Sequence, residues 1–312
     1  MKYQFCTYIK DKQRVDMYLS NIFIEFSRSY IQKIIDKGDL SINWKITTKN
    51  IKISSKDEII LNINIEKTFL QAENLSLDIV FEDENIAIIN KDPWINTHPT
   101  PWIEWKSWTL VNALLYHIKD LSSIWWVERP WIVHRLDKDT SWIIMIAKND
   151  NMMKYLQEII AKREKIWKYY IAIVSGIIKD KEFKIESFIW RHPSDRTRMT
   201  IKNPLNPKIA ISYVKVIDYI DEKYSLIEVK IETWRTHQIR VHLSSIWYPI
   251  IADKVYWDKK INQEILQKYD LERQALHSYK LEIELYWEQK VFIALLKEDM
   301  KKIIWNKLLY KF

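Results

Sequence analysis

The octapeptide HRLDKDTS, residues 134–141, combines an imidazole, two basic side chains and two carboxylates. An aspartate in such surroundings can act as a nucleophile, bind a metal ion or form a structural ion pair. Metal binding is disfavoured, because one histidine and two aspartates within six residues lack the spaced ligand pairs of zinc sites. Nucleotide hydrolysis is not expected, since the sequence has no Walker-type phosphate loop. From the octapeptide alone, a nucleophile and a structural ion pair both remain open.

A second segment, ETWRTHQIRVHLSSIWYPIIADKVYW at residues 232–257, alternates basic and apolar side chains. If it forms a strand, Arg235 and His237 share one face, and Gln238 and Arg240 share the other. An arginine that points into a protein interior usually pairs with a buried carboxylate. Asp137 is therefore a candidate partner for an arginine of this segment.

The chain holds 16 tryptophans and 2 glycines. An average glycine content of about 7% would give roughly 22 glycines in a chain of this length. The two residue types together come to 18, close to a normal glycine complement. We therefore expect many printed tryptophans to stand for glycine, as follows if the gene uses UGA as a glycine codon. Trp44 supports this reading, because it follows Asn43 where an Asn-Gly hairpin turn would fit.

Composition narrows the class of protein. Hydrophobic content of 47% and charged content of 29% fit a globular chain of 312 residues, enough for two domains. The net charge of +8 favours an anionic partner, most often nucleic acid. A single cysteine excludes an intramolecular disulfide and fits a reducing compartment. The sequence shows neither a signal peptide nor an apolar run of about 18 residues, so we expect a cytoplasmic protein without a membrane partner.

The N-terminal segment predicts a small module of two helices and a sheet. Apolar spacing over residues 15–23 predicts the first helix, and Ser27 can cap the second, which ends at Gly38. Short strands follow over 40–42 and 45–47, and DEIILNINIE (57–66) supplies another. The module, residues 13–70, resembles the S4 RNA-binding domain. That resemblance makes four basic residues RNA-binding candidates: Arg14, Arg28, Lys33 and Lys37.

The remainder, residues 75–312, predicts a catalytic domain after a polar link around residues 72–74. Short strand patterns dominate it, with helical patterns over Thr109–Ile118 and Asn151–Lys162. This mixture predicts an α+β fold with a mixed, mainly antiparallel sheet. The whole chain is thus expected to join an S4-like module to an α+β catalytic domain.

Several long motifs in this domain resemble the RluA-type family of RNA pseudouridine synthases. They occur in family order along most of the chain: NKDPW (90–94), HRLDKDTSW (134–142), WRHPSDR (190–196), WRTHQIRVHL (234–243) and RQALHS (273–278). The resemblance implies that the protein isomerises uridines of structured RNA to pseudouridine. It implies no cofactor and no metal ion.

Residue roles follow from the same resemblance. Asp137 is the expected catalytic aspartate, and Arg240 resembles the arginine that pairs with it. Tyr170 resembles the pocket tyrosine that stacks on the target base, because the family pattern K-x-Y-x-A fits Lys168 and Tyr170 rather than Tyr169. Arg135 resembles the residue that fills the space left by the extruded uridine.

Other residues of these motifs have weaker assignments. His134 is expected to order the loop, and Lys138 and Arg191 are candidates for phosphate contact.

Substrate and partner stay broader than activity. An S4-like module with these motifs favours large-subunit rRNA of the 23S type, while tRNA or dual specificity is the alternative. Two other readings are a non-catalytic RNA-binding protein and a nucleoside hydrolase. The retained Asp137, Tyr170 and Arg240 argue against the first, and the module and basic charge argue against the second. A monomer is expected.

Four of these five motifs have tryptophan where the family has glycine, and RQALHS contains neither residue. The positions in the motifs and the hairpin are Trp44, Trp94, Trp131, Trp142, Trp190, Trp234, Trp247 and Trp257. Further expected cases are Trp102, Trp108, Trp125, Trp126 and Trp287. The sequence leaves Trp105, Trp167 and Trp305 undecided.

Overall fold

A computed structural model describes most of the chain. The described residues are 1–23, 26, 28–63, 71–97, 107–118, 131–134, 139–195, 197–202, 207–257 and 259–308. The chain forms two compact units, one built around Met1–Gln71 and the other around Ala72–Asp120 and Ile132–Phe312. None of the described helices is long and apolar enough to cross a membrane.

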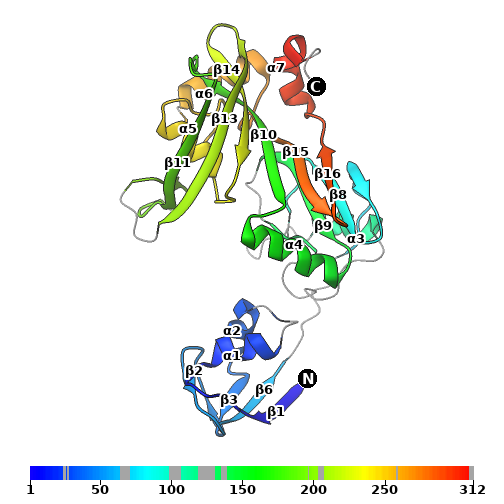
Figure 1. Cartoon of the computed structure of the whole chain (residues 1–312), viewed down its shortest axis with the longest axis vertical. Helices are drawn as coiled ribbons and strands as arrows, with labels where there is room; N and C mark the ends of the chain where they lie inside the picture. Colours follow the sequence, from blue (N-terminus) through cyan, green and yellow to red (C-terminus); the bar gives the residue numbers. More distant parts are fainter. Residues whose placement is uncertain are drawn as a thin grey trace. The chain divides into compact units, whose positions relative to one another are not determined.

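The first unit packs two short helices, α1 (Val15–Ile22) and α2 (Arg28–Asp36), with a small sheet (Figure 1). The sheet has the order β1-β6-β3-β4 and is formed by Lys2–Cys6, Glu58–Asn62, Leu40–Ile42 and Lys45–Ile46. A separate pair joins β2 (Gln13–Arg14) to β5 (Lys52–Ile53). The two predicted helices and the three predicted strand regions are confirmed. Ser27, the predicted helix cap, lies outside the described residues.

The second unit is built on one ten-stranded sheet, of which Figure 1 shows the labelled strands. Its strand order is β12-β11-β13-β14-β10-β15-β9-β8-β7, with β16 added beside β15. In chain order the strands are β7 (Ile79–Glu82), β8 (Ile86–Lys91), β9 (Ser141–Ala147), β10 (Ile166–Ser175), β11 (Glu182–Arg191), β12 (Met199–Thr200), β13 (Lys208–Ile220), β14 (Tyr224–Ile231), β15 (Leu276–Leu285) and β16 (Glu288–Ile293). Only β15 and β9 pair in parallel within the described sheet, so the expected mixed, mainly antiparallel sheet is confirmed.

Five described helices of the second unit lie between its strands in the sequence or follow the last strand. They are α3 (Leu110–His117), α4 (Asp150–Lys162), α5 (Gln238–Ser245), α6 (Lys259–Tyr269) and α7 (Glu298–Leu308). Local signals explain where two of them begin. The Asn149 side chain accepts a hydrogen bond from the Met152 amide at 2.9 Å, and Thr109 forms a capping box with Asn112. The two helices predicted in this domain are therefore confirmed.

The strand reading of residues 238–243 is wrong, because Gln238–Ser245 is helix α5. The apolar residues of this stretch alternate as in a strand, which hid the helix. The turn at His237, whose φ is +55°, ends the extended chain before the helix begins. Arg240 consequently reaches the site from the first turns of a helix.

Strands β8, β9 and β10 lie in the interior of the sheet, each between two other strands. All six residues of β8 and all seven of β9 are buried, as expected for strands covered on both faces. The neighbouring β10 is buried over Tyr170–Val174. Strand β10 contributes Lys168 and Tyr170 to the site, and further site residues come from the segments before β9 and before α5.

Candidate active site

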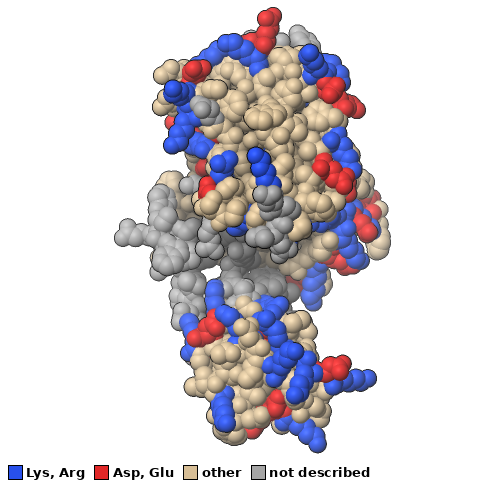
Figure 2. Space-filling view, turned by 90° about the vertical axis from the view of Figure 1, so that its left-hand side faces the viewer, with Lys and Arg blue, Asp and Glu red and all other residues tan. Residues whose placement is uncertain are grey.

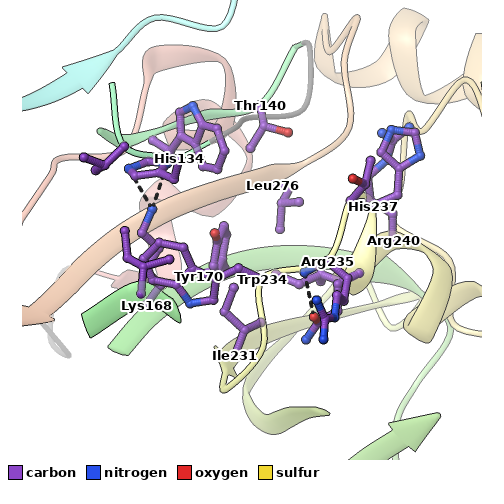
Figure 3. A pocket seen from close by; sticks show the side chains of 16 residues that line it. His134, Thr140, Lys168, Tyr170, Ile231, Trp234, Arg235, His237, Arg240 and Leu276 are labelled. Atoms are coloured by element: carbon purple, nitrogen blue, oxygen red, sulfur yellow. Dashed lines mark hydrogen bonds between the residues drawn. The ribbon is translucent and has the colours of Figure 1, made fainter. Parts of the chain in front are cut away.

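A cavity of about 470 Å³ lies where these strands meet the loop before α5. His134 and Thr140 line it from the segment that holds the HRLDKDTS motif, and Lys168 and Tyr170 line it from β10 (Figure 3). Residues 234–240 form another wall. The structure therefore brings together two motifs separated by about a hundred positions in the sequence.

The expected catalytic Asp137 lies outside the described residues, as do Arg135 and Lys138. Of their described neighbours, His134 before them and Thr140 after them line the cavity. Asp139 has a left-handed backbone, with φ of +67°.

Tyr170 is buried and faces the cavity, whereas Tyr169 points elsewhere. The Tyr169 hydroxyl donates a hydrogen bond to Glu282 Oε2 at 2.9 Å. Successive residues of a strand face opposite sides, so only one of these two tyrosines can line the cavity. A register shift against β15 falls between Tyr169 and Tyr170. The structure thus places the predicted tyrosine, rather than its neighbour, in the site.

Arg240 is buried and forms a forked ion pair with Asp253. Its Nε donates to Asp253 Oδ2 at 2.7 Å, and its Nη2 donates to Oδ1 at 2.8 Å. The Asp253 carboxylate also accepts hydrogen bonds from the amides of Val255 and Tyr256. Sequence reasoning named Asp137 as the partner of Arg240. Asp253 was overlooked as a partner, although it opens the DKVYW segment of the same motif.

Lys168 carries a buried amine that received no role from the sequence. Its ammonium lies 3.2 Å from His134 Nε2, 4.3 Å from the centre of the Trp234 ring and 5.3 Å from that of Trp142 (Figure 3). Burial holds the pKa of Lys168 well below its ordinary value. Among the described residues that line the cavity there is no carboxylate. A buried ammonium facing an open space is suited to an acceptor or anion that enters that space.

The wall formed by residues 234–240 is held by Gln238. Its Oε1 accepts from Thr233 Oγ1 at 2.6 Å and from the Arg235 amide at 3.1 Å, while its Nε2 donates to Ile211 O at 2.8 Å. Arg235 lines the cavity, and its Nε donates to Ile209 O at 3.0 Å. Because these anchors are largely buried, the turn before α5 has a fixed shape.

The remaining predicted RNA-binding residues divide between the two units. Arg191 is exposed at the end of β11. Lys33 and Lys37 are exposed at the C-terminal end of α2, and Figure 2 shows basic side chains gathered on one face of the lower body, which is the first unit. Arg14 and Arg28 both pair with the fully buried carboxylate of Asp16, at 3.0 and 2.9 Å.

Described tryptophans occupy backbone positions that suit glycine. Left-handed φ values occur at Trp44, Trp108, Trp131, Trp247 and Trp287, and the two glycines of the sequence, Gly38 and Gly176, are left-handed as well. A left-handed backbone is costly for a residue with a Cβ and costs glycine nothing. All five of these tryptophans are among those that the sequence assigned to glycine.

Two further tryptophans in the assigned set, Trp142 and Trp257, bury an indole N–H that has no hydrogen-bond partner among the described residues. Trp190 differs, because its Nε1 donates to Lys202 O at 2.7 Å.

No cluster of three or more acidic, histidine or cysteine side chains suited to a metal ion occurs in the part of the chain that the structure describes. The reactive groups gathered at the cavity are two imidazoles, an amine, a phenol and two guanidinium groups. Such a set can bind an anionic or carbonyl-rich ligand in a space partly closed to water.

Comparison with known proteins identifies the family. The family model described as RNA pseudouridylate synthase matches residues 85–245. The "Uncharacterized RNA pseudouridine synthase" of Aquifex aeolicus is 40% identical over 79% of this chain and 77% of its own length. The "Ribosomal large subunit pseudouridine synthase D" of Buchnera aphidicola is 36% identical over 94% of this chain and 93% of its own.

Solved structures share the fold. The human "RNA Pseudouridylate Synthase Domain Containing 1" aligns with a TM-score of 0.58 at 22% identity, covering 72% of this chain and 85% of that one. The chain belongs to the RNA pseudouridylate synthase family. It is an isomerase that converts uridine in RNA to pseudouridine.

Proposed function

We propose that this enzyme modifies one or more uridines of large-subunit rRNA of the 23S type. The observation that carries the proposal is the near full-length similarity to relatives named ribosomal large subunit pseudouridine synthase D, at 34–37% identity. The basic charge of the chain and its N-terminal unit fit a large folded RNA. We propose a cytoplasmic monomer that uses no cofactor.

The reaction breaks the bond between C1′ and N1 and joins C1′ to C5. The proton lost at C5 is balanced by one gained at N1, so atoms and electrons balance without a co-reactant. We propose that Asp137 is the catalytic carboxylate and that Arg135 fills the space left by the extruded uridine. Tyr170 would stack on the base, and the Arg240–Asp253 pair would shape the wall beside it.

We further propose that the first unit is an S4-type RNA-binding module. Its two helices and small sheet, with the basic residues Arg14, Arg28, Lys33 and Lys37 on the helices and beside them, support this assignment. Lys138 and Arg191 would contact phosphate in the catalytic domain. Each such contact would make binding weaker as the salt concentration rises.

The test of the proposed function compares pseudouridine maps of total RNA from cells with and without the gene. Loss of specific rRNA pseudouridines, restored by the wild-type protein but not by Asp137→Ala, is the expected result. Pseudouridines lost from tRNA alone would overturn the rRNA assignment. An Asp137→Ala protein that restores the sites would overturn the assignment of the catalytic residue.

We also propose that the printed tryptophans at glycine-like positions are glycines in the natural protein. The left-handed backbones and the unpartnered indole N–H groups support this proposal. Glycine at positions 142 and 234 would also remove two indoles from the cavity wall and leave more room for a base. Each replacement lowers the mass by about 129 Da, since glycine has no side chain. An intact mass of 38.0 kDa for protein isolated from its native cells would refute it.

A further inference from the structure

The segment Arg273–His277 contacts residues 139–141, which follow Asp137 in the sequence. Arg273 Nη1 donates to the carbonyl oxygen of Asp139 at 3.4 Å. Gln274 Nε2 donates to Thr140 Oγ1 at 2.9 Å. Two successive residues of one segment therefore bind two successive residues of the other.

Ser141, the residue after Thr140, also contacts this segment, through His277. Ser141 Oγ and His277 Nδ1 lie 2.8 Å apart, and both side chains are fully buried. The same two residues are paired in the parallel ladder between β9 and β15. Side-chain and backbone contacts thus fix Asp139–Ser141 against the start of β15.

Burial makes these contacts obligatory. Arg273 is 1% exposed, Gln274 4% and Thr140 2%, so water cannot readily replace a hydrogen bond lost between these groups. Asp139 also has a left-handed backbone, which surrounding contacts must hold in place in a residue other than glycine.

Helix α7 fixes the guanidinium that makes the first of these contacts. Arg273 Nε donates to Asp299 Oδ2 at 2.6 Å, and its Nη2 donates to Oδ1 at 2.9 Å. Asp299 stands in the first turn of α7. A forked pair fixes the plane of the guanidinium, so Nη1 is aimed at the carbonyls of Asp139, Gln274 and Leu276.

We propose that Arg273, held by Asp299 of the C-terminal helix α7, is a positioning residue for the catalytic Asp137. It acts through Asp139, two residues after Asp137, and it does not contact the substrate. This inference rests on the proposed role of Asp137. A catalytic group displaced by about 1 Å can lose on the order of a hundredfold in rate, so a firm anchor close to it has a direct effect on chemistry.

The experiment uses the full chain with an unmodified transcript of large-subunit rRNA. It measures the single-turnover rate of pseudouridine formation with enzyme in excess, and separately the Kd for the transcript. For Asp299→Asn we expect a rate at least about tenfold lower, with a Kd within about twofold of wild type. A positioning residue changes the rate and leaves binding intact, whereas a lost RNA contact changes the Kd.

Asp270→Asn is the matched control. Asp270 forms an exposed ion pair at 3.5 Å with Lys302, which lies in α7 like Asp299. It removes the same charge and should leave both rate and Kd unchanged. Arg273→Lys supplies a second variant that keeps the positive charge but loses the fork, and we expect it to match Asp299→Asn in rate.

Hydrogen exchange separates positioning from general destabilisation. The peptide that carries Asp139, Thr140 and Ser141 should exchange faster in Asp299→Asn and Arg273→Lys, while β13 and β14 keep wild-type protection. Wild-type rates in both variants would overturn the inference. Rate loss that appears only together with faster exchange in β13 and β14 would overturn it as well. An active Asp137→Asn protein would instead refute the proposed catalytic role of Asp137, so the two failures are distinct.

Discussion

Arg240 and Asp253 form a buried, forked ion pair in which both carboxylate oxygens accept from one guanidinium. The Arg240 side chain is 5% exposed and the Asp253 side chain 0%. The guanidinium also lies 5.1 Å from the centre of the Tyr256 ring. The pair therefore ties the first turns of α5, which line the cavity, to the loop after that helix.

Breaking this pair should destabilise the whole second unit. Asp253→Asn leaves a buried guanidinium without its counter-charge, and removing one partner of a buried pair costs about 3–5 kcal/mol. We expect a matching drop in the free energy of unfolding, measured by urea titration followed by circular dichroism. Glu158→Gln breaks the exposed pair with Lys162 and should leave the urea midpoint unchanged. Equal midpoints for Asp253→Asn and wild type would show that the pair carries no stability.

Lys168→Met should stabilise the protein at neutral pH and reduce its activity. Burial depresses the pKa of Lys168 in the folded chain, so the unfolded chain binds the proton more tightly and the charge opposes folding. The penalty is present at neutral pH and disappears as pH rises from the folded pKa toward the ordinary value of 10.5.

The stability difference between Lys168→Met and wild type should therefore shrink in urea titrations repeated at increasing pH toward that value. A constant difference across the range would contradict the assignment. Single-turnover rates should fall, because the cavity loses its buried cation. Lys165→Met is the matched control from an exposed lysine near the same strand, and its activity should not change.

Much of the fold followed from sequence periodicity. Helix α4 (Asp150–Lys162) has an amphipathic apolar pattern and a capping residue, Asn149. Strand β10, which carries Tyr170, has a continuous buried apolar run. Residues 238–243 did not follow, because an alternating apolar pattern there sits in a helix whose start is set by the turn at His237. Helix α5 buries six consecutive residues, Gln238–Leu243, both polar and apolar, so its apolar spacing carries no helical period.

Site residues could be predicted where a sequence motif contains them. They could not be predicted where their role depends on an ion pair with a residue distant in the sequence. Tyr170 lines the cavity, as expected from the K-x-Y-x-A pattern of the family that the sequence resembles. The roles of Asp253 and Arg273 depend on contacts 13 and 26 positions away along the chain. Nothing local in the sequence indicates such partners, since ion pairing depends on how loops and helices meet in space.

Trp287→Gly should stabilise the hairpin between β15 and β16. Tyr286 and Trp287 form its two-residue loop, with φ of +56° and +67°, which is the geometry of a type I′ turn. Trp287 is 90% exposed, so its removal loses little buried surface. We expect a gain of about 1 kcal/mol in unfolding free energy, from relief of a left-handed conformation. Trp167→Gly, inside β10, should destabilise by contrast, and a loss of stability in Trp287→Gly would contradict the assignment.

Asp16→Asn should weaken RNA binding although it makes the protein more basic. The buried carboxylate accepts from Nε and Nη2 of both Arg14 and Arg28, whose side chains remain 37% and 46% exposed. Burial raises the pKa of Asp16, but the hydrogen bonds from Arg14, Gln32 and Arg28 outweigh it and hold that pKa well below its ordinary value. The carboxylate is therefore charged and orients both arginines, and each keeps about three N–H donors for phosphate.

Filter binding of the rRNA transcript at several salt concentrations measures the effect. We expect Asp16→Asn to lose about tenfold in affinity and to show a shallower salt dependence, because fewer phosphates are neutralised. Asp36→Asn, which breaks the exposed pair with Lys49 in the same unit, makes the same charge change and should bind as well as wild type or more tightly. Arg28→Lys, which keeps the charge but not the fork, should weaken binding in a chain whose melting temperature is unchanged. If Asp16→Asn binds as tightly as Asp36→Asn, the carboxylate does not orient the arginines for RNA.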